Sequence, residues 1–144
     1  MLRVEEIVTD TTHQPQASLV LDFHMRQKSR FRAFLADGLE VAIQLPRGKV
    51  LADGQLLRAD NGLIIRISAA QESISQASSG SFGLARLCYH LGNRHVPVEI
   101  GENSVRYLQD GVLDQLLQQW GLTVQHLQAP FHPEPGAYTQ AHHL

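Results

Sequence analysis

The chain has 144 residues, 43% of them hydrophobic, and a formal net charge of −2 at pH 7. This length provides for one ordinary domain or two small ones. The apolar runs are too short to cross a membrane and no signal-peptide pattern opens the chain, so we expect a cytoplasmic protein with no membrane partner. A single cysteine excludes an internal disulfide and a thiolate-rich zinc site.

Charge and histidine are distributed differently between the two halves. Residues 1–75 contain nine Lys/Arg and nine Asp/Glu, whereas residues 76–144 contain three and five. Neither half has the basic excess typical of nucleic-acid binding. Six of the eight histidines lie in the second half, and a mildly acidic, histidine-rich half favours the binding of a cation.

Residues 1–75 have the pattern of a small all-β domain. Alternating apolar and polar residues predict strands at 17–23, 30–34, 39–45, 55–58 and 63–68. The dipeptides Asp37-Gly38, Asp53-Gly54 and Asn61-Gly62 are typical of the turns between them. The pattern indicates a small sandwich or barrel-like domain.

Basic residues stand at alternate positions near the second predicted strand: Arg26, Lys28, Arg30 and Arg32. At a period of two they would share one face of an extended chain. One interpretation is a solvated strand face, and the other is a docking surface for an acidic protein partner. Nucleic acid ranks third, because no aromatic side chains interleave with these charges.

The composition shifts to Ser, Gly and Ala between residues 70 and 83, and we place a domain boundary after residue 75. Apolar spacing then predicts one helix over 82–91, with Ser81 as N-cap and Gly92 as C′ residue. It predicts a second helix that Asp110 caps and Gly121 ends. With strands before, between and after the helices, the order is β-α-β-β-α-β.

This order indicates a ferredoxin-like domain over residues 76–137, and the fold class is α+β. The strands between and after the helices are expected at 96–100, 105–108 and 122–127. Residues 138–144 form a tail that we expect to be flexible.

His95 is the first candidate metal ligand. It stands between the expected helix stop at Gly92 and the strand that begins at Val96, so it lies on a short loop. An ordinary surface histidine has the same features. A single imidazole holds a divalent ion weakly, but a two-fold axis near it would place two equivalent imidazoles on one ion.

His142 and His143 are the second candidate. On a mobile arm they would add imidazoles to an ion held elsewhere, and imidazole suits Ni(II), Cu(II) or Zn(II) better than Mg(II) or Ca(II). The alternative is a tail without a role.

The other candidate residues lack a recognisable partner. His90 is expected to be packed or hydrogen-bonded, His126 and His132 to lie on the surface, and Cys88 to continue an apolar helix stripe. No nucleophile, paired carboxylates or phosphate-binding loop has support, so we expect that the protein is not an enzyme.

Segments along nearly the whole chain carry a family resemblance. The most specific is Cys88-Tyr89-His90-Leu91-Gly92-Asn93-Arg94-His95-Val96-Pro97. The others are Lys28-Ser29-Arg30, Asp37-Gly38, Leu45-Pro46-Arg47-Gly48, Val105-Arg106-Tyr107, Val112-Leu113-Asp114, Gly121-Leu122-Thr123-Val124 and the run from Pro130 to Tyr138. Together they resemble the urease accessory nickel chaperone family, UreE.

The resemblance implies an N-terminal β domain similar to a chaperone peptide-binding domain and a C-terminal ferredoxin-like domain that forms a homodimer. It implies that His95 of both subunits shares one Ni(II) ion, to which His142 and His143 contribute. The implied function is a nickel metallochaperone that delivers this cargo to the urease apoprotein and its GTPase accessory protein for metallocentre assembly. Zn(II) or Cu(II) would also fit such ligands in vitro.

Two departures from the family limit this expectation. Some members have histidines on both sides of the aspartate matching Asp110, where this chain has Gln109 and Gly111. Some members also carry long histidine-rich tails. We therefore expect a single site per dimer and no nickel storage. The alternative function is a metal-independent interaction module that assists urease assembly.

Overall fold

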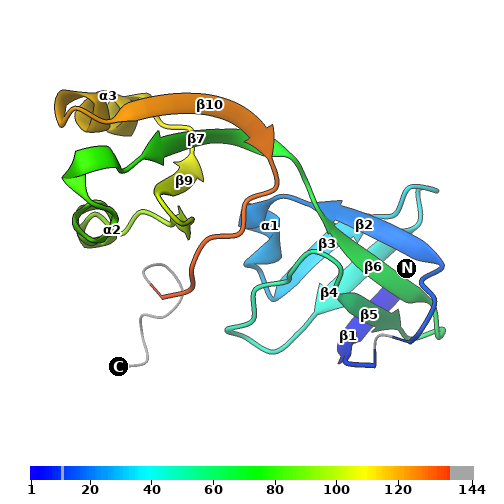
Figure 1. Ribbon diagram of the computed structural model, residues 1–144. Coiled ribbons are helices and arrows are strands. Elements are labelled where there is room, and N and C mark those ends of the chain that lie inside the picture. Colours follow the sequence, from blue (N-terminus) through cyan, green and yellow to red (C-terminus); the bar gives the residue numbers. More distant parts are fainter. Residues whose placement is uncertain (11, 137–144) are drawn as a thin grey trace. The chain divides into compact units, whose positions relative to one another are not determined.

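The computed structural model describes residues 1–10 and 12–136, and the chain divides into two compact units (Figure 1). The first unit ends at Ala70 and the second begins at Gln71. The boundary expected after residue 75 falls inside strand β7 (Glu72–Ser78). Composition marks the Ser-rich segment, but the hydrogen-bonded pairing of β7 with strands of the second unit decides the division.

The first unit is a six-stranded mixed sheet in the order β2-β6-β5-β1-β4-β3. Its strands are β1 (Leu2–Val8), β2 (Ala17–Leu21), β3 (Arg30–Phe34), β4 (Glu40–Gln44), β5 (Leu56–Ala59) and β6 (Ile64–Ala69). All five predicted strands are present, and β1 is an addition to them. Val4, Ile43, Leu57 and Ile65 are at most 1% exposed and form the centre of the core.

A short helix, α1 (Phe23–Arg26), replaces the end of the first predicted strand. The Asp22 side chain caps it by accepting a hydrogen bond from the Met25 amide at 2.9 Å. Arg26 is 1% exposed, and its Nη1 donates to the carbonyl of Leu51 at 3.3 Å. The placement of Arg26 on an exposed strand face is therefore wrong, because the helical turn α1 directs its side chain inward. A single turn is too short to show a helical periodicity in the sequence.

The remaining basic residues of that group are exposed. Lys28 lies between α1 and β3, and Arg30 and Arg32 lie on β3 at the edge of the sheet. Only Arg30 and Arg32 therefore share a strand face as the alternation predicted.

The second unit has the β-α-β-β-α-β order that the sequence predicts. Its elements are β7, α2 (Leu84–Asn93), β8 (Glu99–Ile100), β9 (Ser104–Leu108), α3 (Gly111–Gln119) and β10 (Thr123–Ala129). The strands form an antiparallel sheet in the order β10-β7-β9-β8. This is the ferredoxin-like arrangement, so the prediction of an α+β chain is confirmed.

Both helices pack their leucines on one face of this sheet. Leu87 and Leu91 of α2 are fully buried in one cluster with Leu117 of α3 and with Ala77 and Val105 of the central strands. No helix of the described residues is long and apolar enough to span a membrane.

A buried carboxylate connects α3 to the sheet. Asp114 is 7% exposed and accepts a hydrogen bond from the Tyr107 hydroxyl at 2.6 Å. Its other oxygen lies 2.7 Å from Nε2 of His126, whose side chain is 52% exposed. Three elements, β9, α3 and β10, therefore meet at one side chain.

Burial raises the pKa of Asp114, but the hydrogen bonds from Tyr107 and His126 outweigh it, and the net pKa is lower than usual. Burial, followed by the bond to Asp114, raises the pKa of Tyr107. The tyrosine thus remains a hydrogen-bond donor and the aspartate an acceptor at neutral pH.

We predict that Asp114→Asn lowers the free energy of unfolding by about 1–3 kcal/mol at pH 7, because it weakens buried, charge-assisted hydrogen bonds. The unfolded state binds more protons than the folded state between the ordinary and the lowered pKa of Asp114. Stability from this group is therefore present above about pH 4 and is lost as the pH falls. Urea unfolding of both proteins from pH 7 to 3 measures this. An undiminished difference at low pH would contradict it.

Candidate metal site

The site is built on the last turn of α2. Arg94 is the C-cap, the His95 amide donates to the carbonyl of Gly92 at 2.9 Å, and the Val96 amide donates to Leu91 at 3.2 Å. This pair of bonds is a Schellman motif, which requires a left-handed backbone at the C′ residue. His95 occupies that position with φ 57°. The expected C′ residue, Gly92, instead lies within the helix.

The C-terminal end of α3 provides a direct comparison. There the Gly121 amide donates to Gln118 and the Leu122 amide donates to Leu117, both at 3.0 Å. Gly121 has φ +87°, and the expected glycine stop is confirmed. The same motif thus ends both helices, with glycine in one and histidine in the other.

His95 is unusual in its backbone. Among the described residues it is the only non-glycine with a positive φ. This conformation costs an L-residue roughly 1–2 kcal/mol, although histidine is among the side chains that adopt it more often. The side chain is exposed. Backbone strain at a residue with an exposed imidazole indicates a role other than stabilising its own unit.

A pocket of ≈240 Å³ adjoins the imidazole. Its lining residues are His95, Val96, Pro97, Leu108, Asp110, Leu113 and Phe131. Asp110 is the N-cap of α3, as the sequence predicts, and one of its oxygens accepts the amides of Val112 and Leu113. The pocket is otherwise lined by apolar side chains.

The surroundings of His95 form a partly exposed apolar surface, which we call the His95 face: the exposed Leu108 and Val112 and the half-buried Val96 and Leu116. Val112 is 81% exposed and Leu108 37% exposed. Such exposure of Val112 beside other apolar residues is typical of a surface that another protein covers.

The described residues do not complete a metal site. They contain no group of three or more His, Cys, Asp or Glu side chains that could hold an ion. His142 and His143 lie outside the described residues. His95 as a ligand therefore stays a prediction, and within residues 1–10 and 12–136 it has no set of partner ligands.

The chain after β10 returns toward His95. The Glu134 amide donates to the carbonyl of Val98 at 2.7 Å, and the His132 amide donates to Glu99 at 3.0 Å. Phe131 lines the same pocket as His95. The segment that precedes the tail is thus held beside the strand that follows His95.

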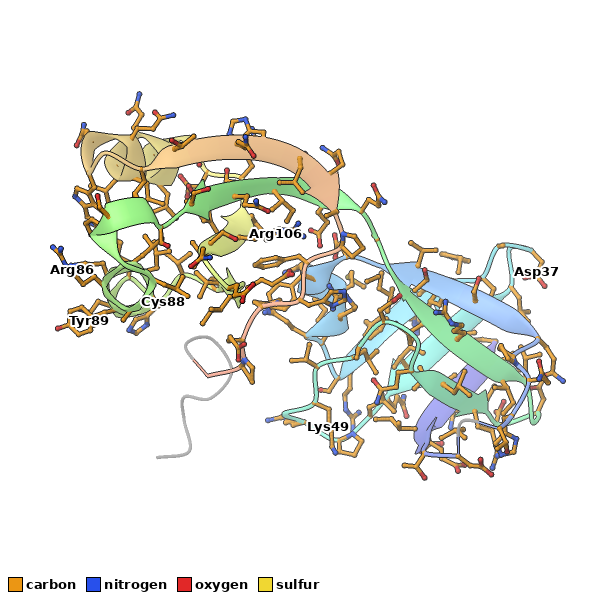
Figure 2. All side chains as sticks on the ribbon, in the orientation of Figure 1. Asp37, Lys49, Arg86, Cys88, Tyr89 and Arg106 are labelled. Carbon is orange, nitrogen blue, oxygen red and sulfur yellow. The ribbon has the colours of Figure 1, made fainter. Side chains whose placement is uncertain are left out.

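The remaining candidates have structural roles. The half-buried ring of His90 packs against Phe82, Tyr89 and Trp120 at centroid distances of 5.3–6.1 Å, in agreement with the expected packing. Cys88 is partly buried. Burial raises the pKa of its thiol, and the negative charge of Glu134 raises it further. Figure 2 shows Cys88 on α2 together with Arg86 and Tyr89.

Sequence reasoning missed the bond between His126 and Asp114. The residues are 12 positions apart on a helix and a strand, so no local spacing relates them. One signal was available: Asp114 adjoins Leu113 on the buried side of α3, where a carboxylate needs partners.

Comparisons with known proteins agree on one family. Residues 3–70 match the UreE urease accessory protein N-terminal domain, and residues 66–144 match the C-terminal domain. Urease accessory protein UreE of Alkalilimnicola ehrlichii is 52% identical over 92% of this chain and 85% of that protein. That of Escherichia coli O157:H7 is 44% identical over 93% of this chain and 88% of that protein. That of Pseudomonas fluorescens is 44% identical over 88% of this chain and 78% of that protein.

We predict that His95→Gly does not destabilise the metal-free protein and raises its free energy of unfolding by up to about 1 kcal/mol. Relief of the left-handed strain offsets the backbone entropy of glycine. The matched variant Gly121→Ala should lose about 1 kcal/mol, since a Cβ there meets no atom within 4 Å and only the backbone conformation is strained. Urea unfolding with chelator present measures both. A clear loss in His95→Gly would mean that the imidazole stabilises its own unit.

Proposed function

Because the chain belongs to the UreE family of urease accessory proteins, we propose that it is a nickel metallochaperone, which binds Ni(II) at a homodimer interface and delivers it for urease assembly. The family is one of accessory proteins, so the prediction that the protein is not an enzyme is confirmed. The observation that carries the proposal is His95, whose strained backbone presents an exposed imidazole beside apolar residues.

Within residues 1–10 and 12–136, one chain offers no group of three potential metal ligands, which supports a shared site. Imidazole is a ligand that Ni(II) accepts, but an ion held by one imidazole exchanges readily. A two-fold axis through the His95 face pairs His95 with its equivalent in a second copy. The Asp110 carboxylate lines the same pocket, and its oxygen that does not cap α3 would be a further donor.

The His95 face supports dimerisation by its composition. Burial of Val112, now 81% exposed, contributes about 1.5 kcal/mol per subunit. The imidazoles then lie within an apolar, water-poor contact, where bonds to a cation are stronger than in water.

The tail histidines are within reach of such a site. Glu134 is held at Val98, three residues from His95. The eight residues from Glu134 to His142 span at most about 26–29 Å when extended. We propose that His142 and His143 complete the ligand set, and that the cytoplasmic partners are the urease apoprotein and its GTPase accessory protein.

We predict that Val112→Glu weakens dimerisation at least tenfold. Loss of one buried valine accounts for roughly this factor, and burial of a carboxylate weakens the dimer further. Val20→Glu, at a residue 62% exposed in the first unit, is the matched control and should remain dimeric. Sedimentation equilibrium distinguishes the two. Equal dimerisation of both variants would remove the His95 face from the interface.

We predict roughly one tightly bound Ni(II) per dimer, by calorimetric titration, and a loss of this binding in His95→Ala. Binding should weaken as the pH falls through about 6.5, because protonated imidazole cannot coordinate a metal. Unchanged nickel affinity in His95→Ala would refute the central assignment.

Truncation after Tyr138 serves as the comparison for this experiment. It should weaken nickel binding less than His95→Ala does. An equal or larger loss would make the tail, and not His95, the core of the site.

A second candidate function, a metal-independent interaction module, is favoured by the exposed cations Lys28, Arg30 and Arg32 at the β3 edge. The double variant Arg30→Glu/Arg32→Glu should reduce capture of urease components from chelator-treated extract, if these cations dock an acidic partner. If capture changes neither with the charge reversal nor with added nickel, these cations are excluded as the docking surface.

A further inference from the structure

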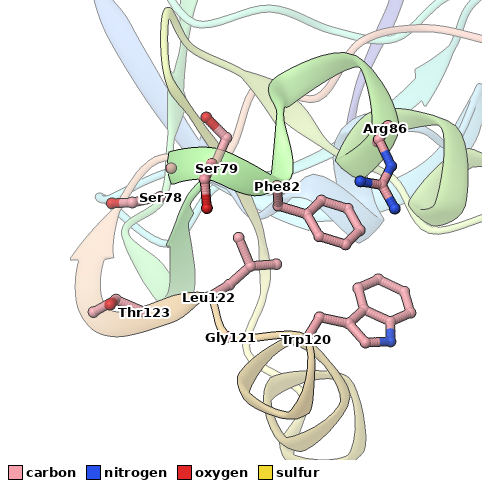
Figure 3. Close-up of a pocket in the computed structure, with 10 residues that line it drawn as sticks. Ser78, Ser79, Phe82, Arg86, Trp120, Gly121, Leu122 and Thr123 are labelled. Atoms are coloured by element: carbon pink, nitrogen blue, oxygen red, sulfur yellow. The ribbon is translucent and has the colours of Figure 1, made fainter.

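A pocket of ≈340 Å³ opens at the N-terminal end of α2, the end opposite His95 (Figure 3). One wall is the segment of residues 78–82, which includes the 3-10 turn Gly80–Phe82, together with Arg86. The other wall is residues 120–123, where α3 ends and β10 begins. This volume lies within the range of small-ligand sites.

Stacked side chains form one side of the pocket. The rings of Phe82 and Trp120 stack with centroids 5.4 Å apart and an interplanar angle of 4°. The Arg86 guanidinium carbon lies 4.5 Å from the Phe82 centroid, and Figure 3 shows the side chains of Arg86, Phe82 and Trp120 grouped together. The cation–π contact holds the guanidinium in place while its N–H donors remain available.

The polar lining has one sign of charge. Arg86 forms no ion pair within the part of the chain that the structure describes, and no acidic residue lines the pocket. Ser78, Ser81 and Thr123 add hydroxyl groups to the rim. The buried Ser79 hydroxyl donates to the carbonyl of Asn103 at 2.9 Å, which fixes this wall.

We propose that this pocket binds the carboxylate of an Asp or Glu side chain that a partner protein presents on an exposed segment. A single guanidinium matches one negative charge and offers a planar fork to a carboxylate. Phe82 and Trp120 also line the pocket and offer apolar contact to the aliphatic stem of the bound side chain. Trp and Arg are also the residues that dominate the energy of protein interfaces.

This site is separate from the metal site. Arg86 and His95 are nine residues apart along α2, about 13 Å at the helical rise. The proposal therefore stands independently of nickel binding, and occupation of the pocket leaves His95 accessible.

Trp120 is the single tryptophan of the chain, so its fluorescence reports on this pocket directly. The full chain, treated with chelator, is titrated with an acetylated and amidated Gly-Gly-Glu-Gly-Gly peptide and with its Gln counterpart. The Glu peptide should give a saturable change in the millimolar range and the Gln peptide none. Arg86→Gln should weaken binding at least about tenfold, because a charge-assisted hydrogen bond is lost.

Matched variants separate the pocket from general charge effects. Arg66→Gln removes the same charge from an exposed position in the first unit and should bind normally. Arg86→Lys keeps the charge without the fork and should be intermediate. Thr123→Glu places a carboxylate at the rim and should abolish binding while Arg86 is intact.

Circular dichroism verifies that each variant is folded. Equal binding of the Glu and Gln peptides, or unchanged binding by Arg86→Gln, would overturn the proposal. Inorganic phosphate that binds more tightly than the Glu peptide would overturn the assignment of a carboxylate.

Discussion

The hydrogen bonds that close α2 are the constraint on which the candidate metal site depends. The amides of His95 and Val96 satisfy carbonyls that the helix would otherwise leave unpaired. They do so only when His95 adopts a left-handed backbone, which glycine adopts with less strain. The helix end and the presentation of the imidazole are therefore the same structural feature, and the backbone strain falls on the residue that we propose as a ligand.

The two ends of α2 present different chemistry. Leu87 and Leu91 are fully buried against the sheet, so the position of each end is fixed. His95 stands at one end among apolar residues, and Arg86 stands toward the other among hydroxyl groups. Asp114 connects α3 to the same sheet. The two ends of α3 carry Asp110, which lines the pocket at His95, and Trp120, which lines the pocket at Arg86.

Features specified by neighbouring residues were predictable. Asp110 caps α3 and Gly121 ends it as expected, because capping needs only a side-chain oxygen or a left-handed residue at the right position. The Ser81 cap was wrong: the 3-10 turn Gly80–Phe82 intervenes, and α2 begins after Gly83. The glycine stop at Gly92 was wrong as well, because the Schellman bonds place the left-handed position at His95.

By itself the sequence determined the element order, the ferredoxin-like class, the family resemblance and His95 as the candidate ligand, since periodicity, caps and motif spacing are local properties. Only the tertiary structure decided the parallel pairings β1–β4 and β2–β6, the burial of Arg26 and the contact of His126 with Asp114. It also decided that Val112 and Arg86 are exposed beside pockets. These depend on contacts between residues far apart in the chain, and nothing in local spacing encodes which distant side chains will meet.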